Sequence, residues 1–445
     1  MEGAEMIQRN ITFDFSRSAG KMKPVGSVNS CAVANDRLRT EMTEALSEMG
    51  VTSVRTHRHP SGSVVDISTV FPCFELDERF EASFNFAPTD KYLLSIRDAG
   101  AEILLRLGES REVLEPHRHN KLPENAEKWA SVCERIIAHY NEGWANGFKL
   151  GIKQVEIMCD VDDPDVITHS PRVYYDFYRI VANRLRARFP RIKLGAYSSL
   201  GFGSLNHYDA SEKERAAIGY LEGFLEYVTA RDTCAPLDFF SWKCLAETPE
   251  ELSLHSSYAR NYLLQYGLKR TASVVSEFNL VGEDNYFSKE YPARLIASLI
   301  LAQKSDISML FYSSANPEDE DCALFSIEDR RRLHKTAAYR AMCCFGSLTK
   351  MKNTVTCTED YRHTIYSLGT TDGTQGAILL CTADYNGVIE LAVNGASFSE
   401  YSIMGIIGGR DRGEGYSTNA SGVKLVDNRI RMRVGSYEVY FISLK

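Results

Sequence analysis

The 445-residue chain lacks several features that would assign it at once to a class of protein. It has no block rich in lysine and arginine, and its formal net charge is −8, so no nucleic-acid partner is expected. No apolar run approaches the roughly 18 residues of a membrane-spanning helix. The first residues, MEGAEMIQRN, lack the charged-then-apolar pattern of a secretion signal. These absences predict a cytoplasmic protein with no membrane partner, and they leave its oligomeric state open.

Paired cysteine motifs are also missing. The eleven cysteines show no paired CxxC spacing, and several, such as Cys159, Cys244 and Cys381, fall inside apolar strand patterns. Cysteine in such a pattern is typical of a reduced core residue. Two His-x-His pairs, at 57–59 and 117–119, lack further ligands in register, so polar lining is favoured over metal binding. We therefore expect no metal and no other cofactor.

From about residue 24 to 340, short apolar runs alternate with amphipathic helical patterns. The composition, 44% hydrophobic and 25% charged, is ordinary for a globular protein with a large core. Eight runs are predicted to be strands, at 24–29, 53–57, 101–107, 155–160, 193–199, 239–244, 272–279 and 307–314. Helical patterns lie between them, for example at 36–50, 123–143, 170–189 and 289–305. Eight alternating strand–helix units predict an α/β fold, a closed (β/α)8 TIM barrel.

Beyond about residue 345 the pattern changes to short alternating strands. Turn residues separate them, including Asp-Gly and Asn-Gly pairs that are typical of hairpins. This pattern predicts an accessory C-terminal β-sandwich domain over 345–445. The run ITFDFSRSAG (11–20) precedes the first barrel strand, so we expect residues 1–23 to supply a strand to the sandwich.

Two carboxylates end strands that face each other across the predicted barrel. Asp160 ends the fourth strand, and Glu277, 117 positions later, lies near the end of the seventh. Active sites of such barrels lie at the carboxyl ends of the strands, where Glu109 and Lys243 are also predicted. Glycoside hydrolysis with retention needs two carboxyl groups about 5–5.5 Å apart, one as acid/base and one as nucleophile. The layout therefore predicts a retaining glycosidase.

The order of these runs resembles glycoside hydrolase family 39, the family of β-xylosidases and α-L-iduronidases, and more closely its uncharacterised bacterial members. The resemblance covers roughly 25–345 and rests on GVTSVRTH (50–57), LRLGES (105–110), the long run at 121–148, DFFSWK (238–243), SEFN (276–279) and MLFYSS (309–314). It implies Glu277 as nucleophile, Asp160 as acid/base and a carbohydrate as partner. We expect these side chains to bind substrate at the mouth, with Trp242 as a platform for a sugar ring: His57, Arg58, Glu109, Cys159, Trp242, Lys243, Asn279 and Tyr312.

The acid/base stretch departs from the family pattern W-E-x-W-N-E-P. Here Cys159 replaces the Asn and Asp160 replaces the catalytic Glu. A thiol is a weak donor, and the shorter Asp draws its oxygens back by roughly 1.5 Å, one C–C bond. Lys243 stands where many relatives have His, and Arg58 and Ser313 stand where Asp is expected. These replacements add two cations to the predicted mouth of the barrel and remove acidic and amide groups from it.

Three interpretations of these departures stay open. The short strands are misaligned by one residue, or the barrel has kept its fold and lost efficient catalysis, serving as a carbohydrate-binding or scaffold protein. In the third, it is a working glycosidase for an acidic sugar whose carboxylate, sulfate or phosphate is bound by Arg58 and Lys243. Strand alternation places Glu156 on the opposite face from the residues that flank Asp160. We therefore expect the Glu156 side chain to form a structural salt bridge or a core hydrogen bond.

Overall fold

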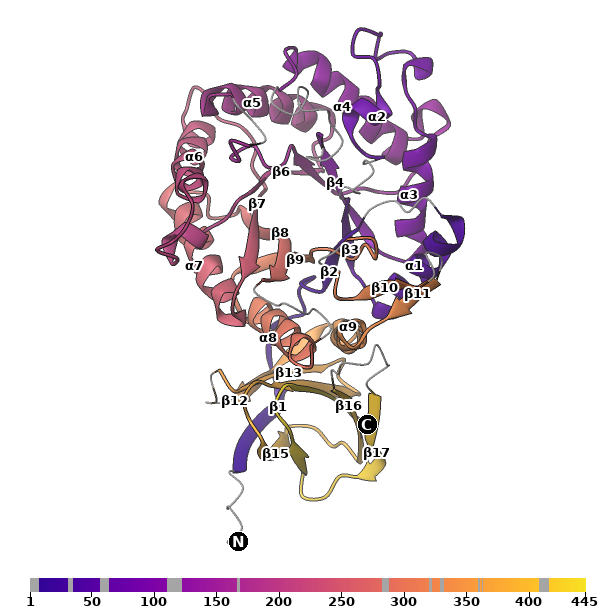
Figure 1. Cartoon of the computed structure of the whole chain (residues 1–445), viewed down its shortest axis with the longest axis vertical. Helices are drawn as coiled ribbons and strands as arrows, with labels where there is room; N and C mark the ends of the chain where they lie inside the picture. The colour runs from indigo at the N-terminus through magenta and orange to yellow at the C-terminus, as the bar shows by residue number, and fades with distance from the viewer. Residues whose placement is uncertain are drawn as a thin grey trace.

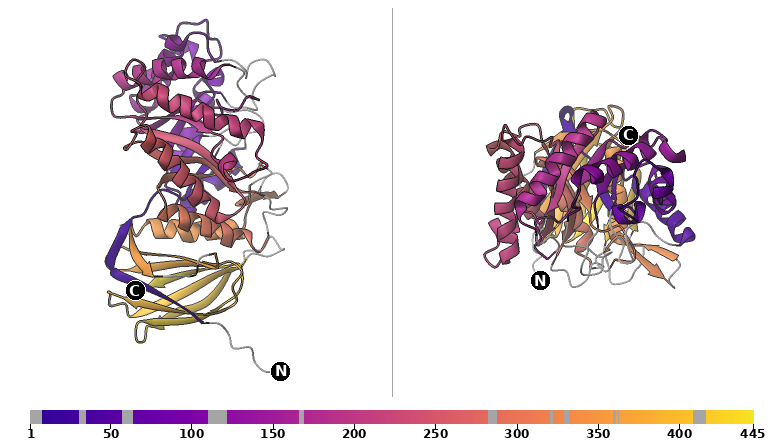
Figure 2. Two further views of the ribbon diagram at one scale, coloured as in Figure 1. Left: turned by 90° about the vertical axis from the view of Figure 1, so that its left-hand side faces the viewer. Right: turned by 90° about the horizontal axis from the view of Figure 1, so that it is seen from above.

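A computed structural model describes residues 8–30, 35–56, 64–109, 122–165, 169–281, 288–319, 322–328, 332–358, 361, 363–407 and 416–445. Its upper part in Figure 1 is a ring of strands surrounded by helices, and its lower part is a β-sandwich. The side view in Figure 2 shows the two parts stacked, with the indigo N-terminal strand crossing from one to the other.

Eight parallel strands close into the barrel in chain order, which confirms the predicted (β/α)8 architecture. They are β2 (Ser27–Ser30), β3 (Ser53–Thr56), β4 (Glu102–Leu107), β5 (Gln154–Ile157), β6 (Lys193–Ser199), β7 (Phe239–Ala246), β8 (Ala272–Leu280) and β9 (Ile307–Tyr312). The second, fourth, sixth, seventh and eighth strands of the barrel are therefore β3, β5, β7, β8 and β9. Each coincides with a predicted strand run.

The helices cover the outside of the barrel, and their ends follow the capping residues of the sequence. Gly50, past the end of the first helix, takes a left-handed φ of 69° and donates its N–H to carbonyls of the last turn. Two later helices begin at capping boxes, Ser211 with Glu214 and Thr248 with Glu251. The described helices are α1 (Asp36–Met49), α2 (Ile67–Val70), α3 (Ala87–Asp98), α4 (Ala126–Asn141), α5 (Pro171–Arg188), α6 (Glu212–Thr229), α7 (Pro249–Gln265), α8 (Tyr291–Lys304) and α9 (Ala337–Thr349).

The interior of the barrel is divided along its axis. One buried cluster, separate from the core beneath the helices, fills it with apolar side chains: Leu104, Phe239, Val274, Met309 and Phe311. Further along the same strands the side chains become polar. Ser198 bonds the hydroxyl of Ser276 at 2.8 Å, and Asn29 donates to the Ser276 carbonyl at 2.7 Å. An apolar floor thus lies below a polar layer near the carboxyl ends of the strands.

The C-terminal part is a β-sandwich built on one curled sheet of nine strands, which confirms the predicted architecture. Its sheet order is β17-β16-β19-β14-β13-β12-β1-β15-β18. The strands are β1 (Gln8–Lys21), β12 (Asn353–Thr358), β13 (Ile365–Thr371), β14 (Gly376–Thr382), β15 (Gly387–Asn394), β16 (Glu400–Ile407), β17 (Tyr416–Lys424), β18 (Arg429–Val434) and β19 (Glu438–Leu444). A hairpin of β10 (Phe325–Glu328) and β11 (Arg332–Lys335) lies outside this sheet.

The N-terminal strand β1 lies inside the sheet, antiparallel to β12 and parallel to β15. Strand β14 is buried on both faces: Ile378 and Leu380 belong to the sandwich core, and Leu379 and Cys381 belong to the core beneath α8 and α9. The division into units over 24–340 and 345–445 stays a prediction, because α9 spans that boundary.

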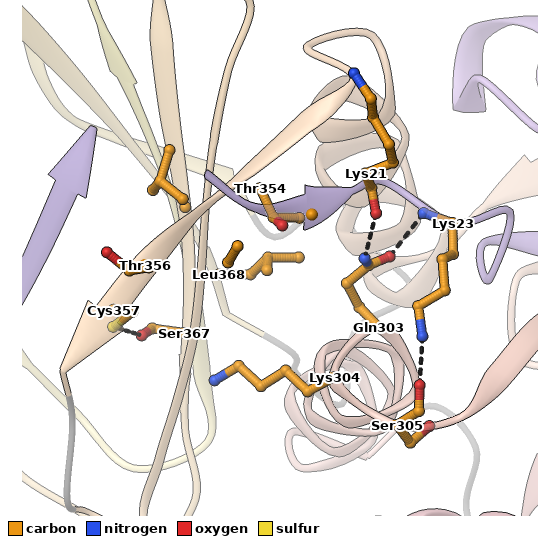
Figure 3. Close-up of a pocket in the computed structure, with 14 residues that line it drawn as sticks. Lys21, Lys23, Gln303, Lys304, Ser305, Thr354, Thr356, Cys357, Ser367 and Leu368 are labelled. Atoms are coloured by element: carbon orange, nitrogen blue, oxygen red, sulfur yellow. Dashed lines mark hydrogen bonds between the residues drawn. The ribbon is translucent and has the colours of Figure 1, made fainter. Parts of the chain in front are cut away.

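A joint between the sandwich and the barrel is drawn in Figure 3. The side-chain amide of Gln303 donates to the Lys21 carbonyl at 2.9 Å and accepts from the Lys23 N–H at 2.8 Å. The Lys23 ammonium donates to the carbonyl of Ala302 in the last turn of α8 and to those of Ser305 and Ile307 just beyond it, where a cation is favoured. A cavity of about 650 Å³ lies beside this joint. Lys23 lines this cavity, but its ammonium group already caps the end of α8.

Within the described residues, no helix is both long enough and apolar enough to span a bilayer.

We predict that the contact between α9 and α1 tolerates no side chain at Gly346. A Cβ there would lie 1.9 Å from the Met49 carbonyl oxygen, a backbone atom that cannot move aside. Gly346→Ala should therefore lower the free energy of unfolding by about 1–3 kcal/mol or more, as overpacked cores do. Chemical denaturation measures this.

The matched control is Gly219→Ala on α6, where the added Cβ meets no atom within 4 Å. This variant should be neutral or more stable by up to about 1 kcal/mol, because alanine is the better helix former. Equal stability of the two variants would contradict the close packing of α9 on α1.

Candidate active site

Three charged side chains, from β7, β8 and the turn after β5, converge at the carboxyl ends of the barrel strands. The ammonium of Lys243 forms ion pairs with the Asp160 carboxylate and, at 3.1 Å, with Oε2 of Glu277. The Lys243 side chain is 17% exposed, and each of the two carboxylates is 12% exposed. The cluster is thus largely removed from bulk water, where each charge needs a partner.

A bulge between β7 and β8 places Glu277 opposite Lys243. Trp242 is paired with Val275, but the next residue, Lys243, is paired with Glu277, so β8 carries one extra residue. Such bulges shift the alternation of side chains and re-aim them. The carboxylate and the ammonium therefore lie next to each other on neighbouring strands.

Asp160 reaches the cluster through an irregular turn, and here the predicted strand of 155–160 is too long. Strand β5 ends at Ile157, and both Met158 and Asp160 take left-handed conformations, with φ of 64° and 57°. The Asp160 N–H donates to the Tyr197 carbonyl at 2.9 Å, which holds the turn against β6. Left-handed φ at two residues other than glycine is costly and is typical of functional sites.

Behind Glu277 lies a fully buried guanidinium. Arg55, on β3, donates to Oε2 of Glu156 through Nε at 2.9 Å and Nη2 at 2.6 Å. Its Nη1 lies 3.2 Å from Oδ1 of Asn29 and 3.5 Å from Oε1 of Glu277. The salt bridge expected for Glu156 is present, and it anchors the arginine that contacts the predicted nucleophile.

The ionisation of both cations is fixed by the carboxylates around them. Burial by itself would lower the pKa of Lys243, but Asp160 and Glu277 outweigh it and raise that pKa well above its usual range. Burial likewise disfavours a charged Arg55, and Glu156 and Glu277 outweigh it, so its pKa is raised. Lys243 is therefore a permanent ammonium and is unsuited to act as a neutral amine nucleophile.

Cys159, which the sequence resemblance aligns with an Asn, lies beside a second buried arginine. Its Sγ lies 3.7 Å from Nη1 of Arg106, whose Nη2 pairs with Asp66 at 2.6 Å. Burial and the neighbouring Asp160 raise the pKa of the Cys159 thiol to about 12, so the sulfur is a thiol and not a thiolate. It lies against the side of the cluster and offers a weak donor.

Two other carboxyl groups near the site titrate around neutrality. Burial and Asp66 raise the pKa of Glu109 to about 7, against the opposing N–H and hydroxyl of Ser68. Burial raises the pKa of Asp162 to about 7 although Ser199 and the Leu200 N–H donate to it. Both carboxyl groups are directed at these partners on α2 and β6.

Several predicted substrate-binding residues lie elsewhere. The indole of Trp242 is fully buried, donates to Ser273 at 2.9 Å and packs on Phe202, so the predicted sugar platform is wrong. Strand alternation directs it outward from the barrel, opposite to Lys243.

Asn279 and Tyr312 are also buried, at 2% and 0% exposure. The Tyr291 hydroxyl donates to Asn279 and lies 3.0 Å from the Tyr312 hydroxyl, so both belong to a hydrogen-bond network under α8. Their side chains are held in this network, and their contact with a substrate stays a prediction. His57 and Arg58 fall outside the described residues.

The residue that sequence reasoning missed is Arg55. A signal was present: arginine occurs inside short apolar strands in SVRT (53–56) and EILLRL (102–107), and glutamate occurs inside QVEI (154–157). Buried charges in consecutive barrel strands need partners across the interior. The sequence therefore indicates that these buried charges pair with one another, but the contact of Arg55 with Glu277 depends on closure of the barrel.

The cluster is an arrangement of acids and bases. Among the described residues, no group of three or more His, Cys, Asp or Glu side chains is placed to hold a metal ion. One nitrogen of Lys243 contacts an oxygen of each carboxylate, and such a bridge is compatible with the short carboxyl separation of retaining glycosidases, about 5–5.5 Å.

We predict that Asp162 makes the protein less stable as pH rises. The folded protein keeps the Asp162 proton up to about pH 7, whereas an unfolded aspartate loses it near 3.9. The unfolded state binds fewer protons over this interval, so stability falls as pH rises through it. Asp162→Asn should flatten the decrease in unfolding free energy between about pH 4 and pH 8, by up to about 1.4 kcal/mol per unit of pKa shift.

Denaturant unfolding at several pH values measures this slope. The control is Asp232→Asn, at an exposed carboxylate, which should keep the wild-type slope. An unchanged slope in Asp162→Asn would show that its carboxyl group is not held protonated.

Comparison with known proteins supports the fold of this chain but does not assign the chain to a family. No protein-family model and no curated protein sequence matches the chain. A glucosidase from Croceicoccus marinus superposes with a TM-score of 0.78 at 18% identity, over 99% of both chains. A monomeric beta-xylosidase from Caulobacter crescentus CB15 gives 0.71 at 11% identity, over 98% of this chain and 99% of the other. A GH39 enzyme from Xanthomonas axonopodis pv. citri gives 0.70 at 12% identity, over 99% and 98%. The chain is therefore similar to these enzymes in having the barrel-plus-sandwich fold of glycoside hydrolases.

Proposed function

We propose that this chain is a retaining glycoside hydrolase, related to family 39, with Glu277 as nucleophile and Asp160 as its catalytic partner. The observation that carries the proposal is the convergence of Asp160 and Glu277 on the single ammonium of Lys243, at the carboxyl ends of the barrel strands. Active sites of such barrels lie at this end, and two carboxylates close enough to share one cation suit retention better than inversion, which requires about 6.5–9.5 Å.

The surroundings of Glu277 suit a nucleophile. Lys243 contacts one of its oxygens and Arg55 lies 3.5 Å from the other, so the carboxylate form is favoured. A nucleophilic carboxylate must be ionised when it attacks the anomeric carbon. The Arg55–Glu156 pair holds the guanidinium in place through two hydrogen bonds.

The position of Lys243 favours a second candidate function. Its ammonium lies between the two carboxylates, where the reacting centre of a substrate would have to come. A barrel whose carboxylates are neutralised from within could bind carbohydrate without cleaving it. The second candidate is therefore a carbohydrate-binding or scaffold protein.

Covalent trapping separates the two functions. We predict that the wild-type chain, treated with a panel of 2-deoxy-2-fluoro glycosyl fluorides, gains the mass of one fluorosugar on Glu277, because fluoride leaves without protonation and the 2-fluoro group slows turnover. Glu277→Gln, which is nearly isosteric, should gain no mass and should hydrolyse nitrophenyl glycosides at least ~1000-fold more slowly. Intact-protein mass spectrometry and peptide mapping make the measurement.

The matched control is Glu226→Gln, at an exposed glutamate on α6, which should be labelled like the wild type. Labelling that persists in Glu277→Gln would refute this residue as nucleophile. If the wild type is neither labelled nor active but Lys243→Met becomes labelled, the second candidate is favoured and Lys243 is the block.

A further inference from the structure

We infer that Lys243 selects the leaving group, and that the site cleaves aryl glycosides, whose phenol departs as an anion, rather than glycosides of alcohols or of other sugars. This inference rests on the proposed function and adds to it the class of substrate.

The first step concerns the charge of Asp160. Its carboxylate is in direct contact with the Lys243 ammonium in a setting where both side chains are less than one-fifth exposed. A carboxylate paired in this way is ionised. Protonation of a departing alkoxide requires a carboxylic acid instead. Asp160 in this state lacks the proton that a sugar or alkyl leaving group needs.

The second step asks whether another described carboxyl group supplies that proton. Burial raises the pKa of both Glu109 and Asp162 to about 7, yet each carboxyl group forms its hydrogen bonds with residues outside the Lys243 cluster. Glu109 accepts from the N–H and hydroxyl of Ser68, at 2.9 and 2.6 Å. Asp162 accepts from the Ser199 hydroxyl at 2.6 Å and the Leu200 N–H at 3.0 Å. Within the described residues, neither takes the place of the missing acid.

The third step is the place of the cation. The Lys243 nitrogen bridges the nucleophile and its partner, so it lies at the bond to be cleaved and not at the periphery of the sugar. A cation there stabilises negative charge as it develops on the departing oxygen, which is stabilisation of the transition state rather than of the ground state. A phenol leaves as a weakly basic anion and needs no proton when such a cation is present.

The fourth step is the charge of the cluster. Lys243 and Arg55 supply two positive charges, whereas Asp160, Glu156 and Glu277 supply three negative charges. Counted over these five side chains alone, the negative charges exceed the positive charges by one. This local excess favours a substrate that arrives neutral and becomes anionic only as it breaks.

The bonds balance in two steps. An oxygen of Glu277 attacks the anomeric carbon, the bond from that carbon to the phenolic oxygen breaks, and the phenolate leaves with the electron pair beside Lys243. Water then attacks the anomeric carbon of the glycosyl ester, Asp160 accepts a proton from it, and the Glu277 carboxylate is released. Because Asp160 starts ionised, it serves as the base of the second step, and it then releases the proton to solvent water, so that it is again paired with Lys243 as a carboxylate before the next substrate binds.

The test is a series of substituted phenyl glycosides of one sugar, from dinitrophenyl to phenyl, with the methyl glycoside and the sugar 1-phosphate. The sugar is the one that the wild-type chain turns over in the nitrophenyl panel. In the wild type, kcat/KM should fall by roughly 100-fold or more from dinitrophenyl to phenyl, the size of a missing general acid. The methyl glycoside and the 1-phosphate should be cleaved more slowly than every aryl glycoside.

Lys243→Met should reverse this preference. Loss of the cation should slow the dinitrophenyl glycoside by about tenfold or more. Without the ammonium, Asp160 and Glu277 are like charges side by side, which favours a proton on one of them. The kcat/KM values for the methyl and phenyl glycosides should then rise relative to the value for the dinitrophenyl glycoside. Lys243→Arg, which keeps the charge, should keep the steep dependence.

The control is Lys153→Met, at an exposed ion pair with Glu102, which should behave as the wild type. The thermal unfolding midpoint of each variant shows whether it is folded. If Lys243→Met is not folded, the comparison uses Lys243→Arg in its place. A shallow dependence in the wild type, turnover of the methyl glycoside, faster cleavage of the 1-phosphate, or an unchanged slope in Lys243→Met would each overturn the inference while leaving the proposed function standing. Absence of any turnover and of any label on Glu277 would instead remove the proposed function itself.

Discussion

The interior of this barrel depends on one constraint: charges buried in its upper layer must neutralise one another. Arg55 pairs with Glu156 and contacts Glu277, which in turn contacts Lys243, and Lys243 pairs with Asp160. These residues come from β3, β5, β8, β7 and the turn after β5. Removing one member leaves the next as an uncompensated charge in a largely dry site. The network therefore positions the candidate catalytic residues and also limits which of them can change.

The same network explains how a carboxylate at position 160 is compatible with a folded barrel. Asp160 is short and has an amide side chain on neither side of it in the sequence, so by itself it would be an under-supported buried carboxylate. The Lys243 ammonium compensates the charge of Asp160, and the Tyr197 carbonyl holds its backbone. Cys159 is accommodated beside Arg106 and is not forced to act as a donor to a sugar. Asp160, Cys159 and Lys243 thus form one consistent set, in which a cation compensates the buried carboxylate.

The sandwich and the barrel share part of one core. Strand β14 contributes alternate side chains to the sandwich interior and to the layer under α8 and α9. The N-terminal strand β1 is held inside the sheet, and Gln303 of α8 bonds the backbone beyond it. The helices that support β8 and β9 are therefore braced on their outer side, and β8 carries Glu277.

The sequence by itself determined the architecture. Eight apolar runs separated by amphipathic helices predict a closed barrel, in which helices cover the outer face of the parallel strands and side chains fill the inside. It also predicted a salt bridge or a core hydrogen bond for Glu156, and it predicted Asp160, Lys243 and Glu277 near the carboxyl ends of their strands. Tertiary structure alone decided where those side chains point. The extra residue of β8 brings Glu277 opposite Lys243, and the early end of β5 turns Asp160 toward it. Trp242 is directed into a packed layer by the same alternation that directs Lys243 inward, whereas Asn279 and Tyr312 are buried in a hydrogen-bond network with Tyr291. A one-residue bulge or a left-handed turn changes the face on which a side chain lies, and neither leaves a periodic signal in the sequence.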